Sequence, residues 1–303
     1  MNAPDPISPR SARVAAARRL VRRNFRYKDR RFLAEGPQAV REAAELRSAR
    51  EPGDAGGCEG RSGGAGGSGQ LPVLAELFAT RDAAERHPEI LDRARRSGAG
   101  VHLAADETLD SLAQTVSPQG LVGVCRFLDR PLDELLAARP RLVAVLAHVR
   151  DPGNAGTVLR CADAAGADAV VLTDASVDVY NPKSVRASAG SLFHLPVAVG
   201  VPAERAAHAL RGAGLRLLAA DGAGEQDLDG ELDAGALSAP TGWIFGNEAW
   251  GLPAETRALA DATVRVPLYG RAESLNLATA AAVCLYTSAR AQRARGKDAA
   301  DRS

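Results

Sequence analysis

The sequence has no features typical of a membrane protein, a secreted protein or a protein that binds a structural metal. Its 303 residues contain no uncharged apolar run of the ~18 to 20 residues that a membrane span needs, and the opening MNAPDPISPRSAR has no apolar core of a secretory signal. The five histidines are scattered without ligand spacing, and the four cysteines form no CxxC pair. The cysteines are Cys58, Cys125, Cys161 and Cys284. We therefore expect a cytoplasmic protein with no disulfide framework and no metal.

The sequence has no nucleotide-binding motif with the flanking strand and helix that such a motif needs to function. No P-loop of the form GxxxxGK[ST] occurs, and a GxGxxG match at Gly64, Gly66 and Gly69 has no strand before it and no helix after it. The match lies in residues 51–70, which are too rich in glycine to bury enough apolar surface to offset their chain entropy. We predict that residues 51–70 are a disordered insert, and we set aside a dinucleotide-dependent oxidoreductase.

The composition is that of a globular chain long enough for two domains. Hydrophobic residues make up 46% and charged residues 25% of the sequence, close to the average for soluble domains. The first elements expected are a helix over 11–24, a strand over 30–36 and a helix over 37–50. After residue 71, strands and helices alternate until residue 128. We expect a small α/β domain over residues 10–128, followed by a linker over residues 129–140.

From residue 141 onward the alternation is more regular. The run LVAVLAHV, residues 142–149, is continuously apolar, as expected for a strand buried on both faces. Further strands are expected at 169–173, 196–200, 215–221, 242–246 and 262–269, with a long final helix at 274–295. The pattern predicts an α/β domain over residues 141–293 whose mostly parallel sheet carries helices on both faces.

Positive charge is concentrated at the front of the chain. Residues 10–31 hold ten Arg or Lys and one acidic residue, whereas residues 131–290 hold thirteen basic and eighteen acidic residues. A basic front on a mildly acidic body indicates a polyanionic partner, although a solvated helix face is the simpler alternative. The candidate RNA contacts are Arg22, Arg23, Arg26 and Lys28, which alternate with Phe25 and Tyr27. Aromatic rings stack on unpaired bases while cations bind phosphates, so we favour RNA.

The loops that follow the strands carry the candidate chemistry, because ligands bind there in parallel sheets. The first strand is followed by RDPGNAGTVLR, where Asn154 is a candidate helix cap and Arg160 lies nearly two turns further on. The strand GWIFG leads into NEAWGLP, in which Gly246 and Gly251 bracket Glu248 as in a binding loop. Each of these loops, and DGAGEQDLDG after residue 220, also fits an ordinary turn when taken alone.

The loop before the final helix carries the most unusual residues. It reads VPLYGRAESLNLATAAA, with Ser274 and Asn276 at the start of an otherwise apolar helix. Free N–H groups at a helix N-terminus favour anionic or electron-rich ligands, although Ser274 alone could be only an N-cap. Asn276 stands between Leu275 and Leu277 on a helix that heads for the core, so we predict a buried amide with specific partners.

Taken together, these motifs resemble a known family. NAGTVLR, IFGNEAWGLP and VPLYGRAESLNLATAAAVCLY are similar, in order and spacing, to the three motifs of the SpoU/TrmH family of RNA ribose 2′-O-methyltransferases in the SPOUT superfamily. The similarity covers about residues 140–293. RRFLAEGPQAVREA and SPQGLVGVCRF resemble the ends of the family's substrate-binding domain. The resemblance implies a trefoil knot in the C-terminal domain, a smaller RNA-binding domain before it, and a homodimer.

The resemblance also implies a cofactor and residue roles. The cofactor would be S-adenosylmethionine, bound in the knot. The matching cofactor positions are Gly246, Val266 and Leu275, with Leu268 and the loop near Ala220 adjacent. Catalytic or substrate-positioning roles fall on Asn154, Arg160, Glu248, Ser274 and Asn276. Arg160 would act either as the base or as a bidentate clamp on a neighbouring phosphate, and the sequence leaves both open.

The resemblance leaves three possible functions: methylation of ribosomal RNA, methylation of transfer RNA, and RNA binding without catalysis. Ribosomal RNA is favoured over transfer RNA because the simplest transfer-RNA members of the family lack a front domain. A non-catalytic RNA-binding or ribosome-assembly protein would use the basic front equally well. The complete set of motif residues favours an active methyltransferase over that last alternative.

Overall fold

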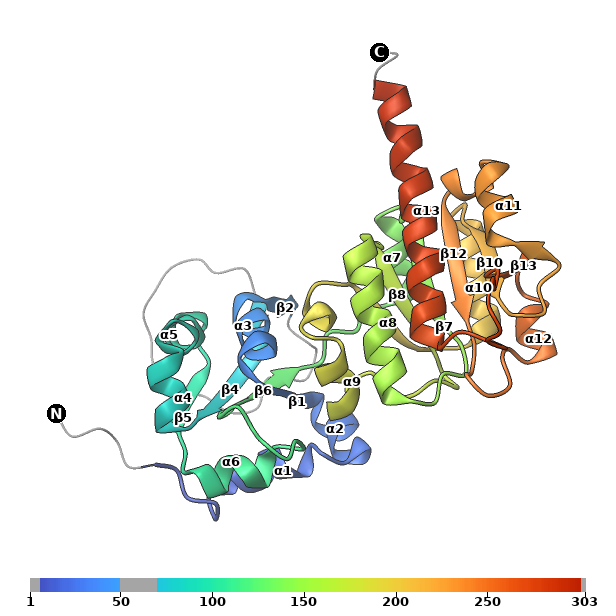
Figure 1. Ribbon diagram of the computed structural model, residues 1–303. Coiled ribbons are helices and arrows are strands. Elements are labelled where there is room, and N and C mark those ends of the chain that lie inside the picture. The colour runs from blue at the N-terminus through green and yellow to red at the C-terminus, as the bar shows by residue number, and fades with distance from the viewer. Residues whose placement is uncertain (1–5, 50–69, 301–303) are drawn as a thin grey trace. The chain divides into compact units, whose positions relative to one another are not determined.

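The computed structural model describes residues 6–49 and 70–300, which divide into two compact units between Leu128 and Asp129 (Figure 1). The helices of the first unit are α1 (Ala12–Arg19), α2 (Arg23–Asp29), α3 (Pro37–Glu45), α4 (Arg81–Arg86), α5 (Pro88–Ser97) and α6 (Asp106–Leu112). Its strands are β1 (Arg31–Glu35), β2 (Arg47–Ala49), β3 (Gln70–Pro72), β4 (Leu74–Ala79), β5 (Gly100–Leu103) and β6 (Leu121–Arg126).

The first unit is built on a four-stranded mixed sheet in the order β1-β6-β4-β5. Strands β1 and β4 pair antiparallel with β6, and β4 pairs parallel with β5. The apolar residues of α1 and α6 pack on this sheet in one core cluster that includes Val14, Leu109 and Phe78. The predicted α/β character of the front is confirmed.

Two front helices differ from the sequence prediction. The helix predicted over 11–24 is two helices, because α1 ends at Arg19 and α2 begins only at Arg23. The helix predicted over 37–50 ends at Glu45, since Leu46 is extended and leads into β2. β2 pairs antiparallel with β3, so that Ala49 lies opposite Gln70. The predicted insert lies outside the described residues, apart from Gln70 in β3.

The second unit holds the remaining elements. Its helices are α7 (Leu132–Ala137), α8 (Pro152–Ala165), α9 (Pro182–Ala187), α10 (Ala203–Gly212), α11 (Leu228–Asp233), α12 (Ala254–Arg257) and α13 (Leu277–Ala300), with short 3₁₀ turns η1 (Ser191–Phe193) and η2 (Ala236–Ser238). Its strands are β7 (Leu142–Leu146), β8 (Ala169–Thr173), β9 (Val197–Val201), β10 (Arg216–Ala220), β11 (Gln226–Asp227), β12 (Thr241–Phe245) and β13 (Ala262–Arg265).

The sheet of the second unit has seven strands in the order β11-β13-β10-β12-β7-β8-β9, and every pair is parallel. One face packs on α7 and α10, whose apolar residues share a core cluster with Val143 and Val145. The other face packs on α8 and α13 (Figure 1), where the buried Trp243 donates from Nε1 to Ser288 Oγ at 2.8 Å. The predicted parallel sheet with helices on both faces is confirmed.

Close packing explains a glycine of the first motif in this unit. A Cβ on Gly156 of α8 would lie 2.3 Å from the Ser184 carbonyl oxygen and 2.7 Å from Ala187 Cβ. Only glycine therefore lets α8 approach α9 this closely. The contact places the N-terminal turns of the two helices beside each other.

The residues expected to be a linker are packed. Leu132 and Leu135 of α7 are buried in the core cluster of the second unit, and Arg130 N donates to the Val197 carbonyl at 2.8 Å. These residues thus form part of the second unit. Within residues 6–49 and 70–300, no helix combines the length and apolarity required to cross a bilayer.

Candidate active site

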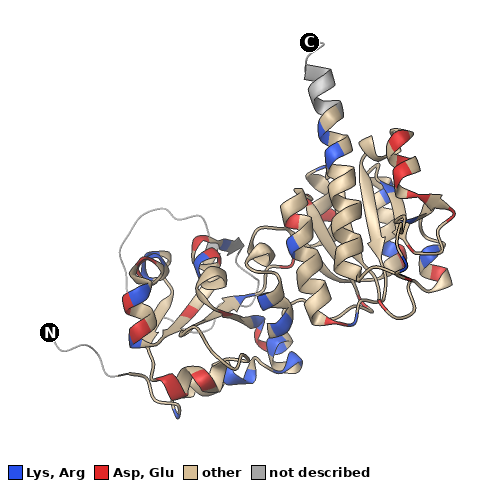
Figure 2. Cartoon of the chain, in the orientation of Figure 1, with Lys and Arg blue, Asp and Glu red and all other residues tan. Residues whose placement is uncertain are grey.

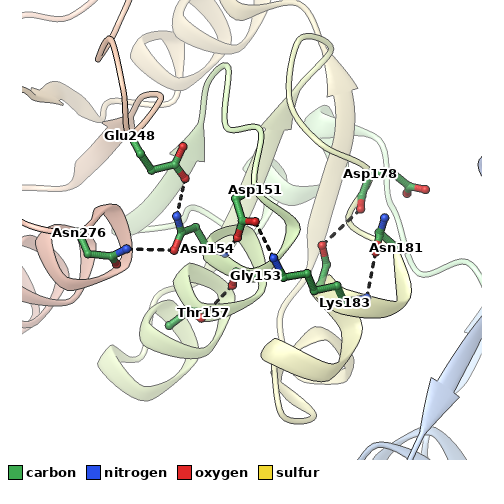
Figure 3. A network of polar contacts seen from close by, with 10 residues as sticks. Asp151, Gly153, Asn154, Thr157, Asp178, Asn181, Lys183, Glu248 and Asn276 are labelled. Carbon is green, nitrogen blue, oxygen red and sulfur yellow. Dashed lines mark hydrogen bonds and ion pairs between the residues drawn. The ribbon is translucent and has the colours of Figure 1, made fainter. Parts of the chain in front are cut away.

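Three side chains from three distant loops meet in one hydrogen-bonded chain (Figure 3). Asn276 Nδ2 donates to Asn154 Oδ1 at 3.2 Å, and Asn154 Nδ2 donates to Glu248 Oε1 at 2.6 Å. Asn276 Oδ1 accepts from the backbone N–H of Ala278 at 2.9 Å and of Thr279 at 3.4 Å. The loops that the sequence singled out therefore converge at the carboxyl edge of the sheet, as parallel strands require.

The direction of this chain is fixed at both ends. Backbone N–H groups at the start of α13 hold the oxygen of the Asn276 amide, so its nitrogen must face Asn154. An ionised carboxylate only accepts, so the nitrogen of Asn154 faces Glu248. Flipping either amide would set oxygen against oxygen. The network therefore fixes which way both amides point and directs the Asn154 Nδ2 donor at Glu248.

Asn276 occupies a different environment from the one predicted. It is exposed rather than buried, because α13 begins at Leu277 instead of Ser274 and places Asn276 at the N-cap position. The predicted specific partners exist, but they belong to an exposed capping residue. Ser274 lies three residues before the helix and is also exposed.

Asp151, not Asn154, caps helix α8. Its Oδ1 accepts from the backbone N–H of Asn154 at 2.8 Å, and Pro152 occupies the first helical turn. Asp151 Oδ2 accepts from Lys183 Nζ at 2.6 Å, a lysine on the neighbouring helix α9. The Lys183 ammonium and the backbone donors hold the pKa of the Asp151 carboxyl below its ordinary value. The sequence carried a signal for this cap, since Asp directly before Pro marks a helix start.

The second motif forms a tight loop after β12. Asn247 and Gly251 exchange two backbone hydrogen bonds of 2.9 Å, and Gly251 has φ of 69°. A Cβ on Gly246 would lie 2.7 Å from the backbone of Gly251 and from Leu252 Cγ. Gly246 thus allows the strand to turn directly into the loop that carries Glu248.

A cavity of about 610 Å³ opens among these loops. Its walls come from the ends of β10, β12 and β13 and from the segment before α13. All five residues predicted to bind the cofactor line it, namely Ala220, Gly246, Val266, Leu268 and Leu275. Glu248 and Ser274 line the same cavity. Its volume is typical of small-molecule sites.

Three of the charged side chains that line the cavity have polar partners. Asp221 and Arg257, both lining residues, approach to 3.8 Å. Arg265 donates to the carbonyl oxygens of Gly224 at 2.8 Å and Glu225 at 3.1 Å. Among the residues that the structure describes, no three His, Cys, Asp or Glu side chains converge as a metal site would require.

Arg160 is not part of the hydrogen-bonded chain. It is exposed on α8, and within the described ranges it makes no hydrogen bond or ion pair. Its guanidinium is thus available to a ligand. Sequence reasoning gave no role to Trp250, which lies within IFGNEAWGLP, or to Lys183, whose side chain contacts Asp151. The chain has only two tryptophans, and this was the available signal for Trp250.

Basic residues lie along the front helices α1 and α2 (Figure 2), but they differ in exposure. Arg22, Arg23 and Lys28 are exposed on or beside α2. Arg26, by contrast, is 2% exposed and donates from Nη1 to the carbonyl oxygens of Leu20 at 2.9 Å and Val21 at 2.6 Å. These carbonyls follow the end of α1 and need donors. The structure therefore removes Arg26 from the predicted phosphate contacts.

The aromatic residues of the front are covered in part. The Arg23 guanidinium lies 5.2 Å from the Tyr27 ring centroid, and that of Arg19 lies 5.1 Å from Phe25. Tyr27 also packs edge-on against Phe127 at 5.4 Å. A base that stacked on these rings would compete with the cation–π contacts already present.

Both parts of the sequence are similar to known protein families. Residues 141–286 match the SpoU rRNA Methylase family, and residues 67–131 match the RNA 2′-O ribose methyltransferase substrate-binding family. The 23S rRNA (guanosine(2553)-2′-O)-methyltransferase RlmP of Bacillus subtilis is 37% identical over 63% of this chain and 73% of its own. The 23S rRNA (guanosine-2′-O-)-methyltransferase RlmB of Bordetella pertussis is 35% identical over 68% of this chain and 84% of its own.

Solved structures extend the similarity to nearly the whole fold. The SpoU methyltransferase AviRb from Streptomyces viridochromogenes, in complex with the cofactor AdoMet, superposes with a TM-score of 0.74 at 28% identity over 94% of this chain and 99% of its own. The AdoMet-bound rRNA methyltransferase from Sinorhizobium meliloti gives a TM-score of 0.72 at 27% identity over 93% and 96%. With its motif residues joined at one cavity, the chain belongs to the SpoU rRNA methylase family.

Proposed function

We propose that the protein transfers a methyl group from S-adenosylmethionine to a ribose 2′-hydroxyl of ribosomal RNA, which releases S-adenosylhomocysteine and the hydroxyl proton. The observation that carries this proposal is the chain Asn276–Asn154–Glu248 beside a cavity of about 610 Å³. Relatives named as 23S rRNA 2′-O-methyltransferases, which are 35% to 37% identical, support the reaction and the substrate class.

The cavity fits S-adenosylmethionine in its size and in the chemistry of its walls. Val264, Val266, Leu268 and Leu275 supply apolar surface, and the strand ends at Ala220 and Gly246 bring backbone polar groups to the same space. Asp221, Glu248 and Glu273 add carboxylates to the same wall, so the cavity offers both apolar surface and hydrogen-bond acceptors to a cofactor. The bound cofactor would supply an electrophilic methyl group on a sulfonium sulfur.

The chain's own residues would orient the hydroxyl that attacks. Glu248 Oε1 is engaged by Asn154, and Oε2 makes no hydrogen bond within the described structure, so it remains an acceptor for a ribose hydroxyl. Holding the two reactants in line can contribute ~7 to 11 kcal/mol to the barrier reduction. We place Asn154 and Asn276 as residues that position Glu248, and Ser274 as a further contact on the cavity wall.

Arg160 would act on the RNA. Its exposed guanidinium offers a planar fork that matches two oxygens of a phosphate. Because a guanidinium stays protonated in proteins, we favour the phosphate clamp over the base. The clamp would hold the nucleotide next to the target ribose.

The two units would have different functions, one in RNA binding and the other in methyl transfer. We propose that residues 10–128 bind RNA through Arg22, Arg23 and Lys28, and that residues 141–293 form the methyltransferase domain. The family match over residues 67–131 supports this division. The substrate would place the protein in the cytoplasm, where ribosomes are assembled.

We further propose a trefoil knot at the cavity loops and a homodimer, as the resemblance implies. Val283 and Tyr286 support the dimer, since they are 36% and 51% exposed and lie one helical turn apart on α13. Sedimentation equilibrium tests it: the wild type should be dimeric, and Tyr286→Arg should shift the protein toward monomer.

The central experiment maps 2′-O-methylation in ribosomal and transfer RNA from cells with and without the gene. Alkaline hydrolysis reads the modification directly, because a 2′-O-methyl blocks cleavage of the adjoining phosphodiester. We expect one protected position in 23S rRNA to disappear with the gene. Loss of a transfer-RNA position instead would assign the alternative substrate. Unchanged patterns, with no heat of S-adenosylmethionine binding in a calorimetric titration, would favour a non-catalytic RNA-binding protein.

A further inference from the structure

Trp250 is an exposed aromatic residue on the wall of the cavity. It lies in the loop 247–251, two residues after Glu248, and 53% of its surface is exposed. The other tryptophan, Trp243, is fully buried. Leaving a large indole in water forgoes apolar burial, so an exposed indole at a binding site indicates a ligand that covers it.

The indole ring of Trp250 packs against the side chain of His148. The His148 ring packs against it with a centroid distance of 5.7 Å and an interplanar angle of 65°. His148 Nε2 in turn pairs with Oγ1 of the buried Thr256 at 3.1 Å. Asn247 Nδ2 donates to the His148 carbonyl at 3.4 Å, which ties the loop to the end of β7.

His148 adopts this position at a cost in backbone energy. Its φ is 60°, a left-handed conformation that non-glycine residues rarely adopt. Such outliers persist only where the surrounding contacts determine them, and they gather at ligand sites. The His148 ring therefore contacts one part of the indole, and 53% of the Trp250 surface stays exposed to solvent.

More apolar surface is exposed on a second loop of the cavity. Leu268, which lines the cavity, is 41% exposed, and the adjacent Tyr269 is 88% exposed. Tyr269 Oη donates to Asp229 Oδ2 at 2.5 Å, which anchors the tip of that ring. Exposed rings and aliphatic groups thus adjoin the same space as the polar network.

We propose that Trp250 stacks on a nucleobase of the substrate RNA, and that His148 positions the indole for this contact. The inference rests on the proposed function and adds a recognition element to it. Trp250 is two residues from Glu248, so a ribose bound at Glu248 would bring its own base or a neighbouring base near the indole. Every base offers a π-face, so one indole binds a base whatever its sequence. Such stacking requires a base out of its helix, the form in which proteins read RNA most often.

Fluorescence tests the contact without any methyl transfer. Because Trp243 is buried, quenching by added RNA reports on Trp250. We expect a ten-nucleotide oligoadenylate to quench the emission of the wild type, and Trp250→Phe to abolish the RNA-dependent part. Quenching of equal size in Trp250→Phe would overturn the proposal. This result does not depend on whether the protein is an active methyltransferase.

Kinetics test the role in the reaction, with 23S rRNA from cells lacking the gene as the methyl acceptor. Trp250→Ala should raise KM for RNA roughly 5- to 150-fold, the range for removal of one base–aromatic stack. Trp250→Phe should stay within about 3-fold of the wild type, because a phenyl ring still stacks. The calorimetric Kd for S-adenosylmethionine should be unchanged in both variants. A parallel rise in that Kd would place the ring on the cofactor, and a change in sedimentation would place it against a second copy; either result would overturn the proposal.

His148→Asn separates support of the ring from backbone strain. Asparagine tolerates a positive φ but carries no ring to pack on the indole. We expect a raised KM for RNA and greater acrylamide quenching of Trp250, together with a lower thermal midpoint because the buried Thr256 hydroxyl loses its imidazole partner. A wild-type KM in this variant would exclude His148 as a positioning residue.

Discussion

Asn154 and Glu248 are separated by 94 positions in the chain, yet the amide of the first donates to the carboxylate of the second at 2.6 Å. The contact links the first turn of α8 to the loop after β12. Asn276 lies 122 positions after Asn154, at the start of α13, and its amide completes this series of hydrogen bonds. Because backbone N–H groups hold the Asn276 amide, the start of α13 is linked by hydrogen bonds to a carboxylate on another loop.

Two substitutions at Asn276 should separate its capping role from its bridging role. Asn276→Asp keeps an oxygen for the Ala278 N–H but loses the donor to Asn154, so stability should hold while turnover falls at least tenfold. Asn276→Leu also loses the cap, which costs ~1 kcal/mol and should lower the thermal midpoint by about 2–4 °C. Thermal melts and single-turnover assays measure the two effects. Full activity in Asn276→Asp would show that the bridge to Asn154 is incidental.

Changes at Arg160 should affect the RNA step alone. Arg160→Lys keeps the charge but loses the planar fork, so it should keep the fold and the affinity for S-adenosylmethionine and lose most turnover. Arg160→Ala should lose more. Calorimetry with S-adenosylmethionine and methyl-transfer assays measure the two properties. Wild-type turnover in Arg160→Ala would exclude both the clamp and the base, and a reduced cofactor affinity would move Arg160 to the cofactor side.

The ion pair between Asp151 and Lys183 should make stability depend on pH. The pKa of the Asp151 carboxyl is lowered in the folded state, so the unfolded state binds more protons in acid. The pair's contribution is therefore present above the ordinary Asp pKa and is lost as pH falls through the lowered value. Both side chains are partly exposed, at 42% and 55%, which limits the contribution to about 1 kcal/mol or less.

Lys183→Met tests this pH dependence in urea unfolding. The variant should be less stable than the wild type at pH 7, and the difference should shrink toward zero below pH 3. Asp151→Asn serves as a control, since an asparagine still caps α8 but no longer titrates. A difference between wild type and Lys183→Met that stays constant from pH 7 to pH 3 would contradict the assignment.

Reversing the exposed charges of the front should weaken RNA binding. In the triple variant Arg22→Glu, Arg23→Glu and Lys28→Glu, RNA affinity should fall, and the slope of log K against log salt should flatten by roughly 0.7 to 0.9 for each phosphate that is no longer neutralised. Affinity for S-adenosylmethionine should not change. Arg26→Gln provides the contrast: it leaves carbonyls at the end of α1 without their donor, so it should lower the thermal midpoint of the first unit. Unaltered RNA affinity in the triple variant would place the RNA elsewhere.

The segment between β2 and β3 should be replaceable by a short turn. Ala49 and Gln70 are directly paired across the two strands, and a two-residue Asn-Gly turn closes such an antiparallel pair. Replacing residues 50–69 with Asn-Gly should leave the thermal midpoint and methyl transfer near wild-type values, since loop length affects stability only weakly. A drop of many degrees would mean that the replaced residues pack on the fold.

The sequence by itself determined the architecture and the membership of the site. Continuous apolar runs such as LVAVL indicate strands buried on both faces, and their alternation with helices predicts a parallel sheet whose binding loops share one edge. The motif residues Asn154, Glu248 and Asn276 could be grouped because those loops meet at that edge. The predicted cofactor residues, which line one cavity, followed from the family resemblance alone.

Only the tertiary structure decided which partner each polar group takes. Local pattern placed the α8 cap on Asn154, but Asp151 holds it because Lys183 from another helix anchors its carboxylate. Arg26 reads as one more surface cation, yet the break between α1 and α2 leaves carbonyls that draw its guanidinium inward. The sequence pattern predicts a buried Asn276, but the helix starts at Leu277 instead of Ser274 and leaves Asn276 exposed as its cap. Periodicity fixes which face of an element is apolar, whereas the donors and acceptors that meet depend on where distant elements bring them together.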